Sequence, residues 1–139
     1  MVEELRSYSS QELVELDGLM HELSATSGCD EELLKNALDD ANVHVYVIRD
    51  SGHIVATGTL CIKHTLEFVI GDVESVVVTS RCRGLGYGKE LMMCVIETAK
   101  GFGAHHIQLT SHGGRVAANG HYRGLGFVLV ETNCYKMVM

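Results

Sequence analysis

The chain has 139 residues, of which 46% are hydrophobic and 21% charged, an ordinary globular composition, so we expect one domain spanning residues 1–139. The N-terminal stretch is acidic and no apolar run approaches the ~20 residues of a membrane span, which argues against a signal peptide and a membrane partner and favours the cytoplasm. A net charge of −7 without a Lys/Arg stripe argues against nucleic acid as a partner.

The N-terminal third has the residue spacing of helices. Residues 5–8 predict a short first strand, and Ser9, with Glu12 three positions later, predicts the N-cap of a helix that continues to Leu23. A second, short helix is expected to begin after Asp30, because apolar residues then recur at helical spacing.

The middle of the chain has the alternation of strands. We predict strands over residues 43–48, 54–62 and 72–79, with a hairpin turn at residues 50–52. The stretch 63–71 fits either a strand end or a loop.

The C-terminal third predicts a helix over residues 88–100, a strand over 106–110, a helix over 116–123 and two short strands within 127–138. The expected fold is therefore α+β, with about four helices flanking one twisted, mostly antiparallel mixed sheet of about six or seven strands. The helix between the strands at 72–79 and 106–110 implies that these two strands are parallel.

Two nearly identical pentapeptides occur in different contexts: Arg-Gly-Leu-Gly-Tyr at residues 83–87 and Arg-Gly-Leu-Gly-Phe at residues 123–127. The second lies between a predicted helix and a predicted strand, so we expect its glycines to take positive φ at the helix end while Leu125 and Phe127 cover the core. The first lies between a predicted strand and a helix start, where several free N–H groups would converge on an anion such as a phosphate. A plain glycine turn with solvated charges is the alternative.

Positive charge gathers at the first pentapeptide, where Arg81, Arg83 and Lys89 surround the glycines. The segment is not a nucleotide P-loop, because Glu90 follows Lys89 where serine or threonine is required. Nor is it a dinucleotide fingerprint, because Lys89 stands where the third glycine belongs. Both nucleotide motifs are therefore set aside.

Two segments resemble motifs of the GNAT superfamily of N-acyltransferases. Residues 81–86 match R/Q-x-x-G-x-G/A, the superfamily's motif for the diphosphate of acyl-CoA, and residues 119–127 resemble its N-x-x-Y-x-x-x-G-F pattern near the C-terminus. The predicted element order is also that of the superfamily, so the resemblance covers essentially the whole chain. The chain looks like the small stand-alone bacterial-type members, and over residues 73–88 it is similar to glucosamine-phosphate acetyltransferases.

The resemblance implies that acetyl-CoA is the co-substrate. Valines 76–78 would offer backbone groups to the pantetheine arm, the N–H groups of residues 83–89 would hold the diphosphate, and Asn119 would contact the pantetheine end. The cofactor-binding residues implied in this way are Val76, Val77, Val78, Arg81, Arg83, Gly84, Leu85, Gly86, Tyr87, Gly88, Lys89, Asn119 and Tyr122.

The implied chemistry is direct attack of a primary amine on the thioester. A backbone N–H of the valine strand, such as that of Val77, would stabilise the oxyanion. Tyr122 is the expected catalytic acid, because the resemblance places it near the sulfur and its hydroxyl, with an ordinary pKa of ~10, is protonated at neutral pH. Packing at the helix end with the hydroxyl in water is the alternative for Tyr122.

Glu74 is the expected catalytic base, because a regular pleat places it on the same face as Val76 and Val78. A strand bulge would reverse that placement, and Glu74 would otherwise be a solvated strand residue or a salt-bridge partner. The other candidates for the base are Glu67, His112 and His64.

No metal is expected, because the eight histidines and five cysteines lack the spacing of a metal site. The scattered cysteines predict reduced thiols, mostly in the core. Direct attack by the amine also makes a nucleophilic role for Cys134 unnecessary.

The sequence thus predicts an acetyl-CoA-dependent N-acetyltransferase whose acceptor is an amine of a small molecule or of a protein or peptide. A non-catalytic acyl-CoA-binding or sensing domain is the first alternative, and an interaction domain with purely structural glycines is the second. Residues 23–34 and 63–71 are expected to shape the acceptor pocket, and no second anion cluster outside residues 81–89 supports a sugar-phosphate acceptor. By analogy with relatives, the strands at 44–52 and 126–139 offer edges for a homodimer.

Overall fold

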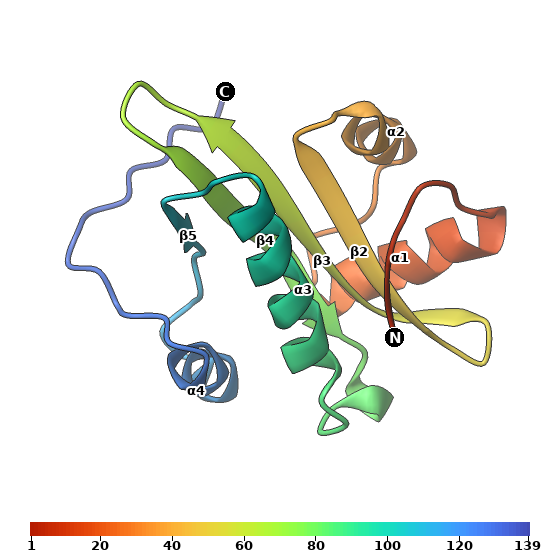
Figure 1. Ribbon diagram of the computed structural model, residues 1–139. Helices are drawn as coiled ribbons and strands as arrows, with labels where there is room; N and C mark the ends of the chain where they lie inside the picture. The colour runs from red at the N-terminus through yellow and green to blue at the C-terminus, as the bar shows by residue number, and fades with distance from the viewer.

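A five-stranded sheet of order β1-β2-β3-β4-β5 runs through the computed structural model, which describes residues 1–139 (Figure 1). Neighbouring strands are antiparallel except β4 and β5, which are parallel as the crossover helix between them predicted. The elements are β1 (Val2–Glu4), α1 (Ser10–Leu23), α2 (Glu31–Asp39), β2 (Val43–Asp50), β3 (His53–His64), β4 (Val69–Val78), the 3₁₀ turn η1 (Ser80–Cys82), α3 (Tyr87–Gly101), β5 (His106–Gln108) and α4 (Val116–Gly124).

Helices cover both faces of the sheet, with α3 on one face and α1 and α2 on the other (Figure 1). Each face has its own apolar core. Leu60, Leu91 and Val95 belong to the core on the α3 side, whereas Leu16 and Leu34 belong to the core beneath α1 and α2. The predicted α+β class and the four α-helices are confirmed. None of these helices combines the length and the apolar character that crossing a bilayer requires.

The beginning of α1 is as predicted, but the first strand is not. The Ser9 hydroxyl accepts a hydrogen bond from the N–H of Glu12 (3.1 Å), and the Glu12 carboxylate accepts one from the N–H of Ser9 (3.1 Å). The first strand is residues 2–4 rather than 5–8. Leu5 follows the strand with its side chain buried in the core beneath α1, and its N–H still donates to the carbonyl of Val45 (2.7 Å).

The hairpin between β2 and β3 forms at the predicted turn. Ser51 (φ 52°) and Gly52 (φ 79°) both take the left-handed conformation that a two-residue hairpin turn requires. The ambiguous stretch 63–71 contains the end of β3, a turn closed by the hydrogen bond from the N–H of Thr65 to the carbonyl of Phe68 (3.0 Å), and the start of β4.

A bulge interrupts the middle of β4. The register against β3 places two residues, Ser75 and Val76, opposite the single residue Gly58, and Ser75 takes a φ of 54°. The extra residue turns Glu74 toward α1 and α2, on the face that holds Val77, whereas Val76 packs on the α3 side. The predicted shared face of Glu74 and Val76 is therefore wrong, because the bulge reverses the alternation of side chains.

The two strands predicted within 127–138 are absent, so the sheet has five strands rather than six or seven. Residues 128–139 make no backbone hydrogen bond, and all their side chains are exposed. Figure 1 shows this segment running along the outside of the molecule beyond β5. Apolar alternation gives a segment strand propensity, but a strand forms only where a neighbouring edge supplies hydrogen bonds.

Candidate active site

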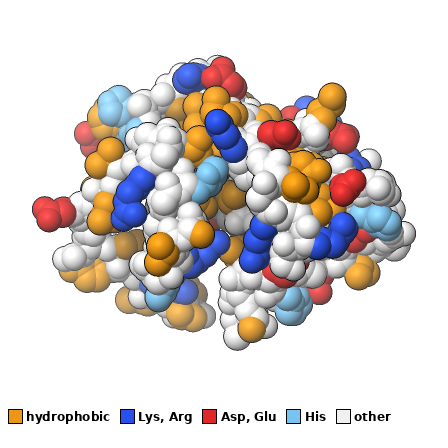
Figure 2. Space-filling view, turned by 90° about the horizontal axis from the view of Figure 1, so that it is seen from below, with side chains coloured by type: hydrophobic (Ala, Val, Ile, Leu, Met, Phe, Trp, Pro, Cys, Tyr) orange, Lys and Arg blue, Asp and Glu red, His pale blue; other side chains and the backbone are white.

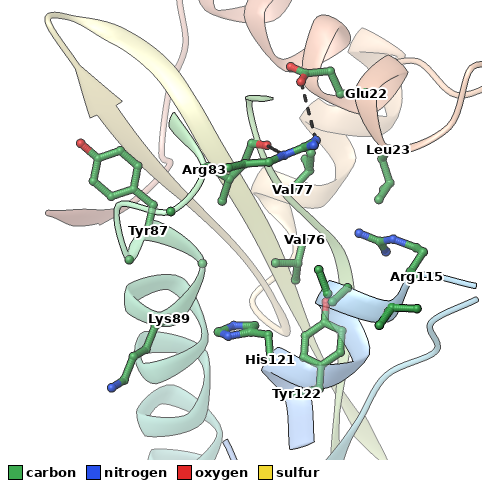
Figure 3. A pocket seen from close by; sticks show the side chains of 17 residues that line it. Glu22, Leu23, Val76, Val77, Arg83, Tyr87, Lys89, Arg115, His121 and Tyr122 are labelled. Atoms are coloured by element: carbon green, nitrogen blue, oxygen red, sulfur yellow. Dashed lines mark hydrogen bonds and ion pairs between the residues drawn. The ribbon is translucent and has the colours of Figure 1, made fainter. Parts of the chain in front are cut away.

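A cavity of about 710 Å³ opens where β4 ends, between the start of α3 and the start of α4 (Figure 3). Its walls come from the end of α1, from valines 76–78, from residues 83–89 and from residues 115–122. Seen from below, Lys and Arg side chains surround a hollow in which hydrophobic side chains and a histidine are visible (Figure 2). Segments far apart in the sequence thus form an apolar hollow with a basic rim.

The loop before α3 presents a run of free backbone donors to this cavity. Gly84 (φ 81°) and Gly86 (φ 86°) take left-handed conformations, which bend the chain into the N-terminus of α3. The first intrahelical hydrogen bond runs from the N–H of Glu90 to the carbonyl of Gly86, and the N–H groups of residues 84–89 have no acceptor in the protein. These free donors, with the positive end of the helix dipole behind them, are of the kind that can hydrogen-bond to an anion.

Glu22, at the end of α1, holds the preceding turn in place. Its carboxylate accepts hydrogen bonds from the Thr79 hydroxyl (2.7 Å) and from the N–H of Ser80 (2.9 Å), and it lies 3.9 Å from the Arg83 guanidinium. The hydrogen bond from Thr79, helped by Ser80 and Arg83, lowers the pKa of Glu22 despite the opposing effect of burial. Sequence reasoning missed Glu22, because nothing in its own helix marks a partner more than fifty residues away.

The cations of the loop have different surroundings. The Arg83 guanidinium also donates to the Val78 carbonyl (3.2 Å), so part of its donor capacity is used inside the protein. Lys89 lines the cavity without an ion pair. Arg81 lies in a separate, smaller pocket beside Glu15, and the exposed Leu85 side chain does not line the cavity.

The edge of β4 that borders the cavity has unpaired backbone groups. The strand pairs with β5 only over residues 70–72, whereas it pairs with β3 along most of its length. From Val73 onward the edge on the β5 side is therefore open, and Val76, Val77 and Val78 line the cavity there. An extended ligand arm can hydrogen-bond to such an edge as an additional strand does.

Tyr122 projects from α4 toward β4 beside Val76 (Figure 3). It is 8% exposed, and its hydroxyl has no hydrogen-bond partner in the protein. Burial raises the pKa of Tyr122, and the charge of Arg115 opposes this shift without cancelling it. The hydroxyl therefore stays protonated at neutral pH and can donate a proton within the cavity.

Other residues around α4 differ from expectation. Asn119 does not line the cavity, since its amide donates to the carbonyls of His112 (3.0 Å) and Arg115 (2.8 Å) and so holds the turn before the helix. His121 and Arg115, which sequence reasoning missed, do line it. The His121 Nε2 atom is buried without a partner. Their positions three and four residues after Ala118 place His121 and Tyr122 on the same helix face as Ala118, and this spacing could have indicated that they line one cavity.

The candidate bases lie in three places. Glu74 is exposed, faces α1 and α2, and does not line the cavity itself. Glu67 and His64 lie at the β3–β4 turn, about 25 Å along β4 from the cavity. His112 lies in the loop after β5, where its ring accepts a hydrogen bond from the N–H of Gly114 (3.0 Å).

Of the two stretches expected to shape the acceptor pocket, only the first reaches this cavity. Leu23 lines the cavity, but no residue of 63–71 does, because the β3–β4 turn is at the opposite end of the sheet. No group of three or more His, Cys, Asp or Glu side chains is arranged to hold a metal ion.

Comparison with known proteins gives one family and a shared fold. The profile of the acetyltransferase (GNAT) family matches residues 10–127, and no curated protein sequence gave a match. A transcriptional regulator from Bacillus halodurans C-125 has 23% identity and a TM-score of 0.86, over 100% of this chain and 99% of its own. Glucosamine-6-phosphate N-acetyltransferase from Arabidopsis thaliana has 20% identity and a TM-score of 0.82, over 99% and 98% of the two chains. AAC(6')-Iy, solved with a bisubstrate analog containing CoA, has 14% identity and a TM-score of 0.80, over 100% and 97%. At such identities the likeness to these structures is one of fold.

Proposed function

The chain belongs to the acetyltransferase (GNAT) family, and from that premise we propose that it transfers an acetyl group from acetyl-CoA to a primary amine. The observation that carries the proposal is the run of free N–H groups at residues 84–89, which lies at the end of an open strand edge. We propose that residues 1–139 act as one domain in the cytoplasm, where the free cysteines remain reduced.

The residues around the cavity fit both the charged and the extended parts of acetyl-CoA. The N–H groups of residues 84–89 and the Lys89 ammonium suit the diphosphate. The open edge at Val76 and Val77 suits the amide groups of the pantetheine arm. In this arrangement Leu85 contributes only its N–H, while Asn119 holds the turn before α4.

The proposed reaction needs a base for the amine and an acid for the leaving thiolate. Acetyl-CoA supplies the thioester: the amine nitrogen bonds to its carbonyl carbon and the carbon–sulfur bond breaks. Glu74 takes the proton of the ammonium, directly or through water, and Tyr122 gives a proton to the thiolate. A backbone N–H of β4, such as that of Val77, stabilises the negative charge on the carbonyl oxygen.

Because of the β4 bulge, the proposed base and the proposed acid lie on opposite faces of the sheet. Glu74 faces α1 and α2, whereas Tyr122 belongs to the core on the α3 side. We therefore propose that the amine approaches from the α1 side, where the base faces it. The titratable hydroxyl of Tyr122 then meets the sulfur from the opposite side.

Calorimetric titration with acetyl-CoA, CoA and ATP, each alone, tests the proposal first. We expect saturable binding of both CoA compounds and none of ATP. A screen of primary amines, followed by the mass of the acetylated product, then tests turnover. Absence of binding to either CoA compound overturns the proposal, and binding without turnover of any amine favours a non-catalytic acyl-CoA-binding domain.

The Glu74→Gln variant tests the base. Loss of a general base lowers rates by about 10²–10⁴, so we expect a fall in kcat of that order with unchanged acetyl-CoA affinity. The matched control is Glu67→Gln, at the far end of β4, which should leave kcat within about twofold. Equal kcat values for wild type and Glu74→Gln would remove Glu74 from the mechanism.

A further inference from the structure

The cavity contains one arginine that neither the diphosphate loop nor the protein uses. Arg115 stands immediately before α4 and lines the cavity, but its guanidinium forms no ion pair and no hydrogen bond within the protein. Figure 3 shows the guanidinium on the far side of Val76 from Lys89, pointing toward Leu23 at the end of α1. Arg115 is thus across the cavity from the donors of the α3 loop.

Backbone donors accompany this arginine. The N–H groups of Ala117 and Ala118, in the first turn of α4, have no acceptor in the protein, and both residues line the cavity. The hydroxyl of Tyr122, on a side chain only 8% exposed, projects into the same space without a partner. The guanidinium and the two N–H groups together form a site for a carboxylate or a phosphate next to this buried hydroxyl.

The cavity lining contains almost no negative charge. Glu22 is the only carboxylate among the lining residues, and its oxygens already accept hydrogen bonds from Thr79 and Ser80. An acceptor with several positive charges would meet Arg115 and Lys89 there, whereas the one free carboxylate proposed to face it, Glu74, does not line the cavity. An acceptor that carries its own negative charge would be attracted.

Resting on the proposed function, we infer that the acceptor is an amine that also carries an anionic group, and that Arg115 and the first turn of α4 bind this group. The Arg115 guanidinium that binds this group points toward Leu23 at the end of α1. Arg115 therefore determines which amines are acetylated, while the α3 loop binds acetyl-CoA. A polycationic amine is a poor acceptor for the same reason.

Matched pairs of amines test the inference in wild-type protein. O-phosphoethanolamine is compared with ethanolamine, β-alanine with β-alaninamide, and spermidine serves as the polycation, each at saturating acetyl-CoA. We expect kcat/KM to be at least tenfold higher for the anionic member of at least one pair. A preference for the uncharged members or for spermidine overturns the inference while leaving the acetyltransferase activity in place.

The Arg115→Gln variant distinguishes the acceptor from the cofactor as the source of the bound anion. We expect the KM of the anionic amine to rise at least tenfold, with kcat and acetyl-CoA affinity within about twofold of wild type. Arg123→Gln, at the other end of α4 and outside the cavity, is the matched control and should change none of these values. A tenfold loss of acetyl-CoA affinity in Arg115→Gln would assign the arginine to the cofactor instead and overturn the inference.

If no amine in the panel is acetylated, a binding measurement tests whether Arg115 binds an anion. Inorganic phosphate is titrated calorimetrically into protein saturated with CoA, where the α3 loop is already occupied. Saturable binding that disappears in Arg115→Gln supports the inference, and absence of binding in wild type overturns it. Failure of wild type to bind CoA at all would instead overturn the proposed function.

Discussion

The two pentapeptides of this chain have nearly the same residues and opposite surroundings. At residues 83–87 the glycines lead into α3, and the six N–H groups of residues 84–89 are free. At residues 123–127 they end α4, and the N–H groups of Leu125, Gly126 and Phe127 donate to carbonyls of the last helical turn. The first can therefore bind an anion, whereas the second has no donors left for one.

The position relative to a helix decides this difference. A helix begins with unsatisfied N–H groups and ends with unsatisfied carbonyls, so the same Gly-x-Gly presents donors at one end and covers acceptors at the other. Gly126 has the expected positive φ of 101°, but Gly124 is the last residue of α4 and does not. Leu125 and Phe127 pack against the core, as predicted.

The largest effect is expected for Tyr122→Phe, because the hydroxyl stands beside the second pentapeptide yet serves the cavity of the first. Loss of a general acid lowers kcat by about 10²–10⁴, while acetyl-CoA affinity should stay within about twofold. Steady-state kinetics with calorimetry checks this. An unchanged kcat would mean that the α4 end is purely structural, which would sharpen the contrast between the two segments.

The pH dependence of Tyr122 follows from its burial. Because burial raises the pKa of Tyr122, the folded protein holds the phenol proton more tightly than the unfolded chain does. Its contribution to stability is present below the ordinary value of about 10 and is lost as the pH rises through the raised value. We expect kcat to show no loss from tyrosine ionisation below about pH 10; a loss near pH 8 would contradict this.

The next largest effect is expected for Gly86→Ala, with Gly126→Ala as its matched control. Both glycines have positive φ, so either alanine should destabilise the fold by about 1–2 kcal/mol. Only Gly86→Ala places a Cβ where the donors converge, and we expect its acetyl-CoA affinity to fall about 10–100-fold. Equal losses of affinity in the two variants would break the comparison.

A smaller effect is expected for Glu22→Gln, which weakens the anchor of the first segment. Thr79 and Ser80 lose a charged acceptor, so the loop should be less ordered and acetyl-CoA affinity should fall about three- to tenfold. Because the pKa of Glu22 is lowered, its stabilising contribution is present above about pH 4.3 and is lost as the pH falls through the folded value. Affinity equal to that of wild type would show that the loop keeps its shape without this anchor.

The smallest effect is expected for Phe127→Leu, in the second segment. The ring of Phe127 meets that of Tyr122 edge-on, with centroids 5.9 Å apart, a contact worth about 0.5–1.5 kcal/mol. Thermal unfolding should show a decrease in stability of that size, with acetyl-CoA affinity unchanged. A loss of affinity without a loss of stability would contradict the structural role of this end of α4.

The structure agrees with the sequence at several places where neighbouring residues carry the signal. The Ser9 cap, the turn at Ser51 and Gly52 and the glycines before α3 depend on φ angles and hydrogen bonds within a few residues. The sequence also pointed to Val76–Val78 and Tyr122, which line the cavity, because the spacing of a motif is a local property. Their binding and catalytic roles stay predictions until the variants above are measured.

The sequence by itself determined the order of elements as far as α4, the helix starts and the place of the glycine loop before α3, because periodicity and capping are properties of short segments. Tertiary structure alone decided that Glu22 anchors the loop, that Arg115 faces the same cavity and that the β4 bulge turns Glu74 toward α1. It also left residues 128–139 outside the sheet. Strand register and the packing of distant segments depend on the whole chain, so no local pattern encodes them.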